Sequence, residues 1–265
     1  MHCEEKLYAI REVSELTGIK PVTLRAWQRR YNIIQPERTE KGHRLYTEQH
    51  IEQIKVIQGW LEKGVAIGKV KALLESGVDS VESEVSSEHL DEVEQMLAAL
   101  AMLNKSKADS VLGQVCKEYP LDIINARFIQ PATDALKQVK RSQQSLQYGM
   151  FQSLVLDKLS SILEAENKVA RRGKCLLVSY DSLGSIELRL WALKLADNGY
   201  NISFIEAVED VSALVDHPTL AKHQAVSIFA AQAPAQVQLK SISKLAEKMG
   251  EAFLPSPLVE SLIQV

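Results

Sequence analysis

The chain has 265 residues, of which 46% are hydrophobic and 25% charged, so it has room for a sizeable core and for more than one domain. No apolar run is long enough to span a bilayer, and the first residues lack the basic start and apolar stretch of a signal peptide, so we expect a cytoplasmic protein with no membrane partner. The formal net charge of −3 hides an asymmetry: residues 1–76 carry 13 Lys and Arg against 10 Asp and Glu, whereas the remainder carries 18 against 24, so only the first part is expected to favour phosphate.

Two short helices with a tight turn between them are predicted at the start of the chain. Apolar residues recur at helical spacing over residues 10–17, and we expect them to be buried: Ile10, Val13 and Leu16. Gly18 suits the left-handed position after a helix, and Pro21 suits the first position of the next one. This arrangement predicts a helix-turn-helix, in which the second helix enters a DNA groove.

The second helix, over residues 21–31, is expected to turn Leu24 and Trp27 inward. The other side is polar and cationic, with Thr23, Arg25, Gln28, Arg29 and Arg30. Arginine suits guanine edges and phosphates, and threonine can meet a base or a phosphate, so the early residues are candidate base readers. A basic face that is merely solvated is the alternative interpretation of the same pattern.

A basic hairpin is predicted to follow, with a turn around Glu40, Lys41 and Gly42. Gly42 can take a positive φ there, and the alternation of a strand places Arg44 and Tyr46 on one face and His43 and Leu45 on the other. His43 has no second imidazole or thiolate near it in sequence, so we expect a polar residue of this wing and not a metal ligand. Helices are predicted from the N-cap Thr47 to Leu61, before Gly64, and over residues 67–74.

Residues 8–76 resemble the DNA-binding domain of the MerR family of transcription regulators. The resemblance rests on Y-x-I-x-E-V at Tyr8 to Val13, T-G-I at Thr17 to Ile19, T-L-R at Thr23 to Arg25, and P-x-R-x-x-x-G-x-R-x-Y at Pro36 to Tyr46. Carried over residue by residue, it implies DNA-binding roles for Thr23, Arg25, Trp27, Arg38, His43, Arg44 and Tyr46. In this resemblance Trp27 stands where the family usually has an aromatic residue near a phosphate.

The resemblance also implies how the protein acts. In the MerR family the second helix enters the major groove, the wing reaches the flanking minor groove, and a homodimer binds a pseudo-palindromic promoter. Members typically bend and untwist promoters whose spacer is overlong, so that RNA polymerase can engage both promoter elements, and this distortion is a form of indirect readout. The expected partners are therefore double-stranded promoter DNA, RNA polymerase and a second copy of the chain, while the sign of regulation stays open.

A polar, acidic and serine-rich segment, residues 77–87, is predicted to be a linker between domain 1–76 and a helical bundle at 88–172. The bundle is expected from four apolar stripes: Leu90, Val93, Leu97 and Leu100; Val111, Leu112 and Val115; Ile123, Ile124 and Phe128; Leu154, Leu159 and Ile162. Pro131 should break or kink the third helix. Cys3, Cys116 and Cys175 lie too far apart in sequence for a thiol-based metal sensor, and we expect them to be reduced.

Residues 173–265 change to the period of strands. The apolar run at 175–180 and two further strand-like runs at 201–207 and 225–231 alternate with helical segments at 185–198, 211–215 and 237–249. Alternation of this kind indicates a parallel sheet with crossovers. The predicted fold class is therefore a multi-domain α and α/β protein: a winged helix-turn-helix, a helical bundle, and a small Rossmann-like (flavodoxin-like) domain.

This domain order resembles the cobalamin-binding branch of the MerR family, in which a D/E-x-H-x-x-G motif follows the first strand and its histidine can ligate cobalt. Here the corresponding residues are Asp181 to Ile186, with Leu183 at the histidine position and Ile186 at the glycine position. An aliphatic side chain has no lone pair for a metal. Trp27, Trp60 and Trp191 all lie outside the predicted bundle, where that branch has a tryptophan, and Gln147 and Tyr148 stand where it has a Glu-His pair.

The chain is therefore more similar to the MlrA-type subgroup, whose sensor domain of this kind is degenerate. The similarity rests on V-T-L-R-A-W-Q-R-R-Y at Val22 to Tyr31 and on G-H-R-L at Gly42 to Leu45. We expect no cofactor and no metal, with a cobalamin-dependent light or ligand sensor as the alternative, and we interpret Asp181 as a loop or cap residue. No catalytic constellation is present in a context that could assemble it, so we expect no enzyme.

Overall fold

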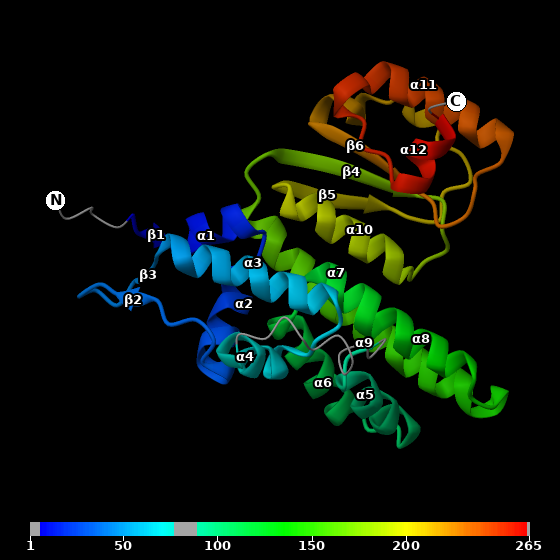
Figure 1. The fold of residues 1–265 in the computed structure, drawn as a ribbon. Helices are drawn as coiled ribbons and strands as arrows, with labels where there is room; N and C mark the ends of the chain where they lie inside the picture. The colour runs from blue at the N-terminus through cyan, green and yellow to red at the C-terminus, as the bar shows by residue number, and fades with distance from the viewer. Residues whose placement is uncertain (1–5, 77–88, 264–265) are drawn as a thin grey trace. The chain divides into compact units, whose positions relative to one another are not determined.

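The computed structural model describes residues 6–76 and 89–263, and its contacts divide the chain into two compact units, Met1–Phe151 and Gln152–Val265 (Figure 1). The predicted linker at 77–87 lies outside the described residues. The predicted DNA-binding domain and most of the predicted bundle fall together in the first unit, so the domain limits at 76, 88 and 172 stay predictions. The fold class itself is confirmed, as the elements below show.

The helix-turn-helix forms where the sequence predicts it. Helix α1 (Ile10–Thr17) ends at Gly18, which has φ +73°, and helix α2 (Pro21–Ala26) begins with its proline. The second helix continues to Tyr31, but its last part, η1 (Trp27–Tyr31), has the wider turn of a π-helix. Leu24 and Trp27 are buried, as predicted.

One predicted core residue of α1 is wrong. Leu16 is 56% exposed, whereas Thr17 is buried and its hydroxyl donates to the carbonyl of Val13. Positions 10, 13 and 17 follow the spacing of one helix stripe, and Leu16 lies beside that stripe. A polar hydroxyl does not by itself predict burial, but its bond to the preceding turn makes Thr17 compatible with a buried position.

The wing is a small antiparallel sheet in the order β1-β3-β2, formed by β1 (Tyr8–Ala9), β2 (Glu37–Arg38) and β3 (Arg44–Tyr46). Gly42 has φ +78° in the turn, as predicted. Strand β1 was not predicted: Tyr8 pairs with Tyr46, and Ala9 with Leu45. Tyr8 and Ala9 therefore add a third strand to the wing.

Helices α3 (Glu48–Glu62) and α4 (Ile67–Ser76) complete the DNA-binding part. Thr47 caps α3, since its side-chain oxygen accepts from the N–H of His50 at 3.3 Å. Its inward positions are buried: Ile51, Ile54, Ile57 and Leu61. Both helices confirm the prediction from periodicity.

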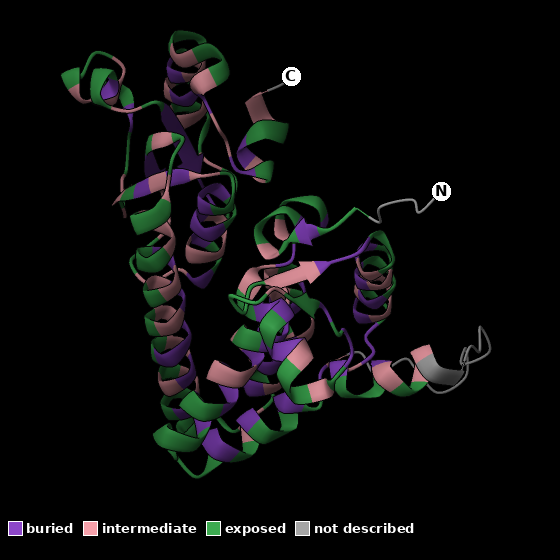
Figure 2. Cartoon of the chain, turned by 90° about the vertical axis from the view of Figure 1, so that its left-hand side faces the viewer, coloured by how far each residue is buried: buried purple, intermediate pink, exposed green. Residues whose placement is uncertain are grey.

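Most residues of the predicted stripes are buried, whereas Leu97 and Ile162 are only partly buried. The elements of the bundle are α5 (Glu92–Ala101), α6 (Lys105–Glu118), α7 (Leu121–Ile124), the π-helical η2 (Asn125–Ile129), α8 (Gln130–Lys137) and α9 (Arg141–Val169), which runs on into the second unit. Figure 2 shows buried residues alternating with exposed ones along these helices. The described helices, taken together, include none that combines the length and apolar character needed to cross a membrane.

The predicted irregularity at Pro131 is present as η2, immediately before α8. A proline has no N–H for the carbonyl four residues earlier and would clash with it in a regular α-helix. That carbonyl belongs to Arg127, and it accepts instead from the N–H of Leu90 at 3.0 Å. The carbonyl that the proline leaves without a helical donor is thus hydrogen-bonded by a residue from another segment.

Glu92 gives the first unit a pH-dependent stability. Burial raises the pKa of its carboxyl, and the nearby carboxylates Glu118 and Asp91 act in the same direction. The folded state therefore holds this proton to higher pH than the unfolded chain, so its stabilising contribution is present in acid and is lost as the pH rises through the folded pKa. We expect Glu92→Gln to raise the urea midpoint at pH 7 by more than at pH 4.

The control for this pH effect is Glu94→Gln, which removes an exposed carboxylate of the same helix. It should shift the urea midpoint little at either pH. Equal shifts for Glu92→Gln at both pH values would show that loss of the buried charge is not the cause.

The second unit has a parallel sheet in the order β5-β4-β6, formed by β4 (Gly173–Ser179), β5 (Tyr200–Ile205) and β6 (Ala225–Phe229). The connecting and flanking elements are α10 (Ile186–Asp197), η3 (Ser212–Leu214), η4 (Pro218–Lys222), α11 (Gln236–Met249), η5 (Gly250–Ala252) and α12 (Pro257–Ile263). The parallel sheet with crossovers is confirmed, and α12 was not predicted.

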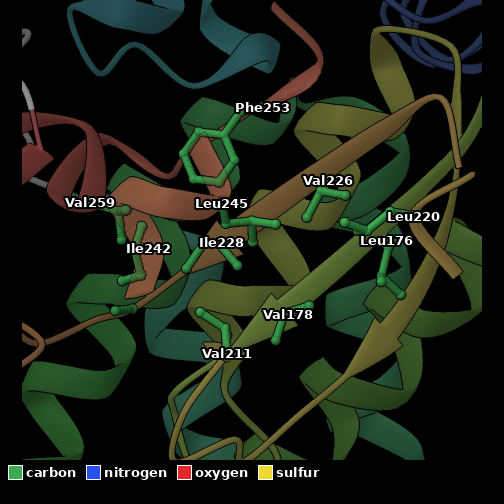
Figure 3. Close-up of a cluster of buried hydrophobic side chains, with 11 residues drawn as sticks. Leu176, Val178, Val211, Leu220, Val226, Ile228, Ile242, Leu245, Phe253 and Val259 are labelled. Carbon is green, nitrogen blue, oxygen red and sulfur yellow. The ribbon is translucent and has the colours of Figure 1, made fainter. Parts of the chain in front are cut away.

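The sheet is covered on both faces. One face carries a cluster in which Leu176, Val178, Val226 and Ile228 meet Ile242 and Leu245 of α11 and Val259 of α12 (Figure 3). Alternate residues point the other way, and Ser227 there accepts from the indole N–H of Trp191 in α10 at 2.9 Å. Burial on both faces explains why the strands read as continuous apolar runs.

Both outer strands have main-chain groups occupied by other segments. Asn167 of α9 accepts from the N–H of Ile202 at 2.8 Å and donates to its carbonyl at 3.0 Å, as a neighbouring strand would. At β6, the N–H groups of Leu254 and Ser256 donate to Val226 and Ile228. The β5 and β6 edges are thus partly sealed.

Gly173 begins β4 in a conformation that requires glycine. Its φ is +107°, and an added Cβ would lie 2.6 Å from Cδ of Gln224, whose side-chain oxygen already accepts from the N–H of Lys174. We expect Gly173→Ala to destabilise the second unit by about 1–3 kcal/mol in urea unfolding. Gly59→Ala, in the open middle of α3, is the matched control and should stabilise by about 0.5–1 kcal/mol.

Neither Cys116 nor Cys175 forms a disulfide bond within the part of the chain that the structure describes. Burial raises the pKa of the Cys175 thiol to about 12, so it stays protonated and serves as a small core residue. Cys3 lies outside the described residues.

Candidate nucleic-acid interface

The second helix has three exposed arginines, Arg25, Arg29 and Arg30. Arg25 and Arg29 are exposed one turn apart on the outward side, while Thr23, Leu24 and Trp27 are buried on the other. The helix axis separates these two sides, because residues four apart share a face. Arg25 is therefore available for a base edge, whereas Thr23, only 3% exposed, is not available in this arrangement.

The wing adds a second cationic surface. Arg38, Lys41 and His43 are exposed, and Arg44 is partly buried. The Nε–H of Arg44 donates to Oε1 of Gln28 at 2.6 Å, so the wing is tied to the second helix by side chains. This link was not predicted, because the two residues were assigned to separate elements and only the fold brings them together.

Tyr46 lies beneath the junction of helix and wing. It is 1% exposed, its ring meets that of His50 edge-on with centroids 6.1 Å apart, and its hydroxyl has no hydrogen-bond partner among the described residues. Burial raises the pKa of Tyr46, while the charges of Arg44 and Arg25 act in the opposite direction. Tyr46 is thus a buried residue close enough to Arg44 and Arg25 to feel both charges.

Trp27 is fully buried within the first unit. Its indole N–H donates to the carbonyl of Glu118 at 2.7 Å, at the end of α6. In this arrangement it packs the second helix against the bundle and does not face solvent. Of the residues predicted to bind DNA, four are exposed or partly exposed, Arg25, Arg38, His43 and Arg44, and three are buried, Thr23, Trp27 and Tyr46.

The loop after β4 in the second unit is braced by its own polar groups. The carboxylate of Asp181 accepts from the N–H of Ala231 at 2.8 Å and from the hydroxyl of Ser185 at 3.2 Å, and Ser185 caps α10. Leu183 projects outward and is 75% exposed. Over residues 6–76 and 89–263, no group of three or more His, Cys, Asp or Glu side chains is placed to hold a metal ion.

Several known proteins are similar to this chain in sequence. A family model described as "MerR HTH family regulatory protein" matches residues 8–77. The HTH-type transcriptional regulator MlrA of Escherichia coli strain K12 is 30% identical over 200 residues, which are 75% of this chain and 79% of that protein. The chain belongs to the MerR family. Within that family it is similar to MlrA of Salmonella typhimurium strain LT2, with 34% identity over 172 residues, 65% of this chain and 68% of that one.

A further MerR-type relative is matched over a smaller part. The HTH-type transcriptional repressor CarH of Myxococcus xanthus is 30% identical over 125 residues, which are 44% of this chain and 42% of that protein. The predicted family and its MlrA-like character are thus confirmed. The chain is a MerR-family DNA-binding transcription regulator and not an enzyme.

Proposed function

We propose that this regulator binds a pseudo-palindromic promoter as a homodimer in the cytoplasm and distorts the duplex so that RNA polymerase can engage it. The observation that carries the proposal is the bond between Arg44 of the wing and Gln28 of the second helix. It joins two cationic surfaces into one. A helix and a wing held at fixed separation suit a major groove and the flanking minor groove of the same duplex.

The proposed contacts divide into two kinds. Arg25 reads a base edge, since its guanidinium is exposed on the outward side of α2. Arg38, His43 and Arg44 contact the backbone or minor groove from the wing. Thr23, Trp27 and Tyr46 are buried, so in this arrangement their part is to hold the helix and the wing in place.

Promoter distortion follows from paired contacts of this kind. A dimer would place two helices and two wings on one duplex, and the free energy of these contacts offsets the cost of bending and untwisting it. Sequence preference then arises partly at base pairs that the protein never touches. We propose that RNA polymerase recognises the distorted promoter.

We propose that the regulator works without cobalamin. The loop that would carry the cobalt-ligating histidine has the exposed, aliphatic Leu183, and Asp181 is engaged within the loop itself. These residues do not fit the group. The alternative, a cobalamin-dependent light or ligand sensor, predicts that cobalamin absorbance stays with the protein after desalting, and we expect a colourless protein.

The proposal is tested with duplexes that the wild-type protein selects from a random-sequence library. We expect enriched duplexes with two inverted half-sites and a footprint across both. Failure to enrich any sequence would overturn the proposed function.

Arg44→Ala should weaken binding to the selected duplex about tenfold, since it removes one charge from the wing and its tie to Gln28. The far-ultraviolet circular dichroism should be unchanged, because Arg44 lies at the surface of β3. Arg171→Ala is the matched control, an exposed arginine in the second unit that should leave binding unaffected. Equal affinities for wild type and Arg44→Ala would exclude the wing from the interface.

A further inference from the structure

We infer that Glu118 is a positioning residue that holds the reading helix of this regulator in its DNA-binding pose. The inference rests on the proposed binding of promoter DNA and adds a residue outside the MerR-type domain. We call Glu118 with its partners Trp27, Arg30 and Tyr31 the Glu118 anchor. Its members lie up to 91 positions apart in the chain and meet within the first unit.

The contacts converge on one residue. The indole of Trp27 donates to the main-chain carbonyl of Glu118 at 2.7 Å, the hydroxyl of Tyr31 donates to its carboxylate at 2.5 Å, and Arg30 forms an ion pair with the same carboxylate. Gln114, one turn earlier on α6, also donates to that carboxylate, at 3.4 Å. The second helix is therefore bound to α6 by main-chain, hydroxyl and charge interactions together.

Burial makes these contacts consequential. The side chain of Glu118 is fully buried, and a buried carboxylate is tolerated only when charged or polar partners surround it. Burial, together with the bond to Glu118, raises the pKa of Tyr31, so Tyr31 remains a donor. Removing the charge of Glu118 leaves Arg30 without the partner that now neutralises it.

The anchor is built on the end of the second helix. Trp27, Arg30 and Tyr31 belong to the π-helical stretch η1, which continues α2 and also carries the exposed Arg29, and Trp27 is buried on the side away from Arg25. Helix α2 packs against α6 (Figure 1). A π-turn is costly in isolation and persists where surrounding contacts fix it, so the anchor sets the direction of the helix that bears Arg25.

Two further bonds extend the contact to other elements of the DNA-binding part. The N–H of Ile67, at the start of α4, donates to the hydroxyl of Tyr119 at 3.4 Å, and Arg127 donates to the carbonyl of Glu62, at the end of α3, at 2.9 Å. The residue after Glu118 and the second π-helical stretch, η2, thus also contact the DNA-binding part. A rearrangement of the bundle would therefore change the position of the reading helix.

The anchor also reduces the positive charge that Arg30 presents to DNA. Arg30 is 48% exposed but is paired with Glu118, so its attraction to phosphate is reduced. Losing the anchor should misalign Arg25 and free Arg30 at the same time. The first effect weakens sequence-specific binding, and the second strengthens binding to any duplex.

The test compares Glu118→Gln with wild type on the selected duplex and on a shuffled duplex of the same composition. We expect the affinity ratio to fall at least tenfold, with binding to the shuffled duplex retained or increased. The double variant Arg30→Gln with Glu118→Gln should return shuffled-duplex binding to the wild-type level or below. Glu94→Gln, which removes an exposed carboxylate of the same bundle, is the control and should leave the ratio unchanged.

A second measurement needs no DNA. In a full-length chain with Trp60→Phe and Trp191→Phe, the fluorescence reports Trp27 alone, and acrylamide should quench it more strongly after Glu118→Gln. If Glu118→Gln merely unfolded the protein, it would lose binding to both duplexes, and Glu118→Asp would bind neither duplex better. Because Glu118→Asp keeps the charge, we expect its affinity ratio between the selected and shuffled duplexes to lie between those of Glu118→Gln and wild type.

The outcomes separate the two proposals. If wild type discriminates between the duplexes and Glu118→Gln does so equally well, the positioning role is wrong and the proposed function stands. Unchanged quenching of Trp27 would likewise overturn the anchor. If wild type itself shows no preference between the duplexes, the proposed function fails, and the positioning role fails with it.

Discussion

Arg25→Ala is expected to weaken binding to the selected promoter duplex by about 1–3 kcal/mol, which is roughly a 5- to 150-fold loss of affinity. Arg25 is the exposed basic residue nearest the start of α2, where the reading helix of a helix-turn-helix meets base edges. Its planar guanidinium can give two hydrogen bonds to one guanine. Losing them should relax sequence preference at one base pair of each half-site.

The measurement is a titration of fluorescent duplexes in which that base pair is varied. Arg25→Lys keeps the charge but loses the fork, so it should bind weakly and discriminate poorly. Arg29→Ala is the comparison on the same face, one turn later, and should lower affinity uniformly across sequences. A uniform loss for Arg25→Ala would make it a phosphate contact instead of a reader.

Trp27→Ala is expected to lower the free energy of unfolding of the first unit by about 3–5 kcal/mol, a large share of the stability of an ordinary domain. The side chain is fully buried, and its indole satisfies the carbonyl of Glu118. Truncation leaves a cavity and an unpaired carbonyl together. Urea unfolding followed by circular dichroism measures the loss.

Trp27→Phe distinguishes packing from DNA contact. The ring still fills most of the space, so we expect a smaller loss of stability, about 1–2 kcal/mol for the missing hydrogen bond and volume. If Trp27 acts only through packing, promoter affinity should fall in parallel with the fraction folded. Full stability with reduced affinity would return it to the DNA contacts that the family resemblance implies.

Local signals made the helices of the DNA-binding part predictable. Gly18, Pro21 and Thr47 mark helix ends through their own backbone or side-chain chemistry, and the structure has α1, α2 and α3 at those ends. Strand β1 gave no such signal. It has two residues, and it exists because Tyr8 pairs with Tyr46, far along the chain.

The site was predicted in its residue types but not in its exposures. Periodicity placed Arg25 outward correctly, and it left Thr23 on the polar side although the structure buries it against the rest of the first unit. Nothing in the pattern around residue 118 pointed to the second helix. A single glutamate near the end of an amphipathic helix looks like a solvated residue until the fold brings Trp27, Arg30 and Tyr31 to it.

In the second unit the strands were predictable and their edges were not. Continuous apolar runs predict a sheet covered on both faces, and β4, β5 and β6 form one. Asn167 could not be recognised beforehand, because its bonds to Ile202 depend on where α9 ends relative to β5. The same holds for the segment after α11 that bonds to β6.

The covered edges of that sheet limit how copies of the regulator can associate. A second chain that tried to extend the sheet at β5 would have to displace the amide of Asn167, and at β6 it would meet the segment at Leu254 and Ser256. Strand-to-strand growth, the usual first step of aggregation through open sheets, is thereby discouraged. The proposed homodimer is therefore not expected to form by extending this sheet.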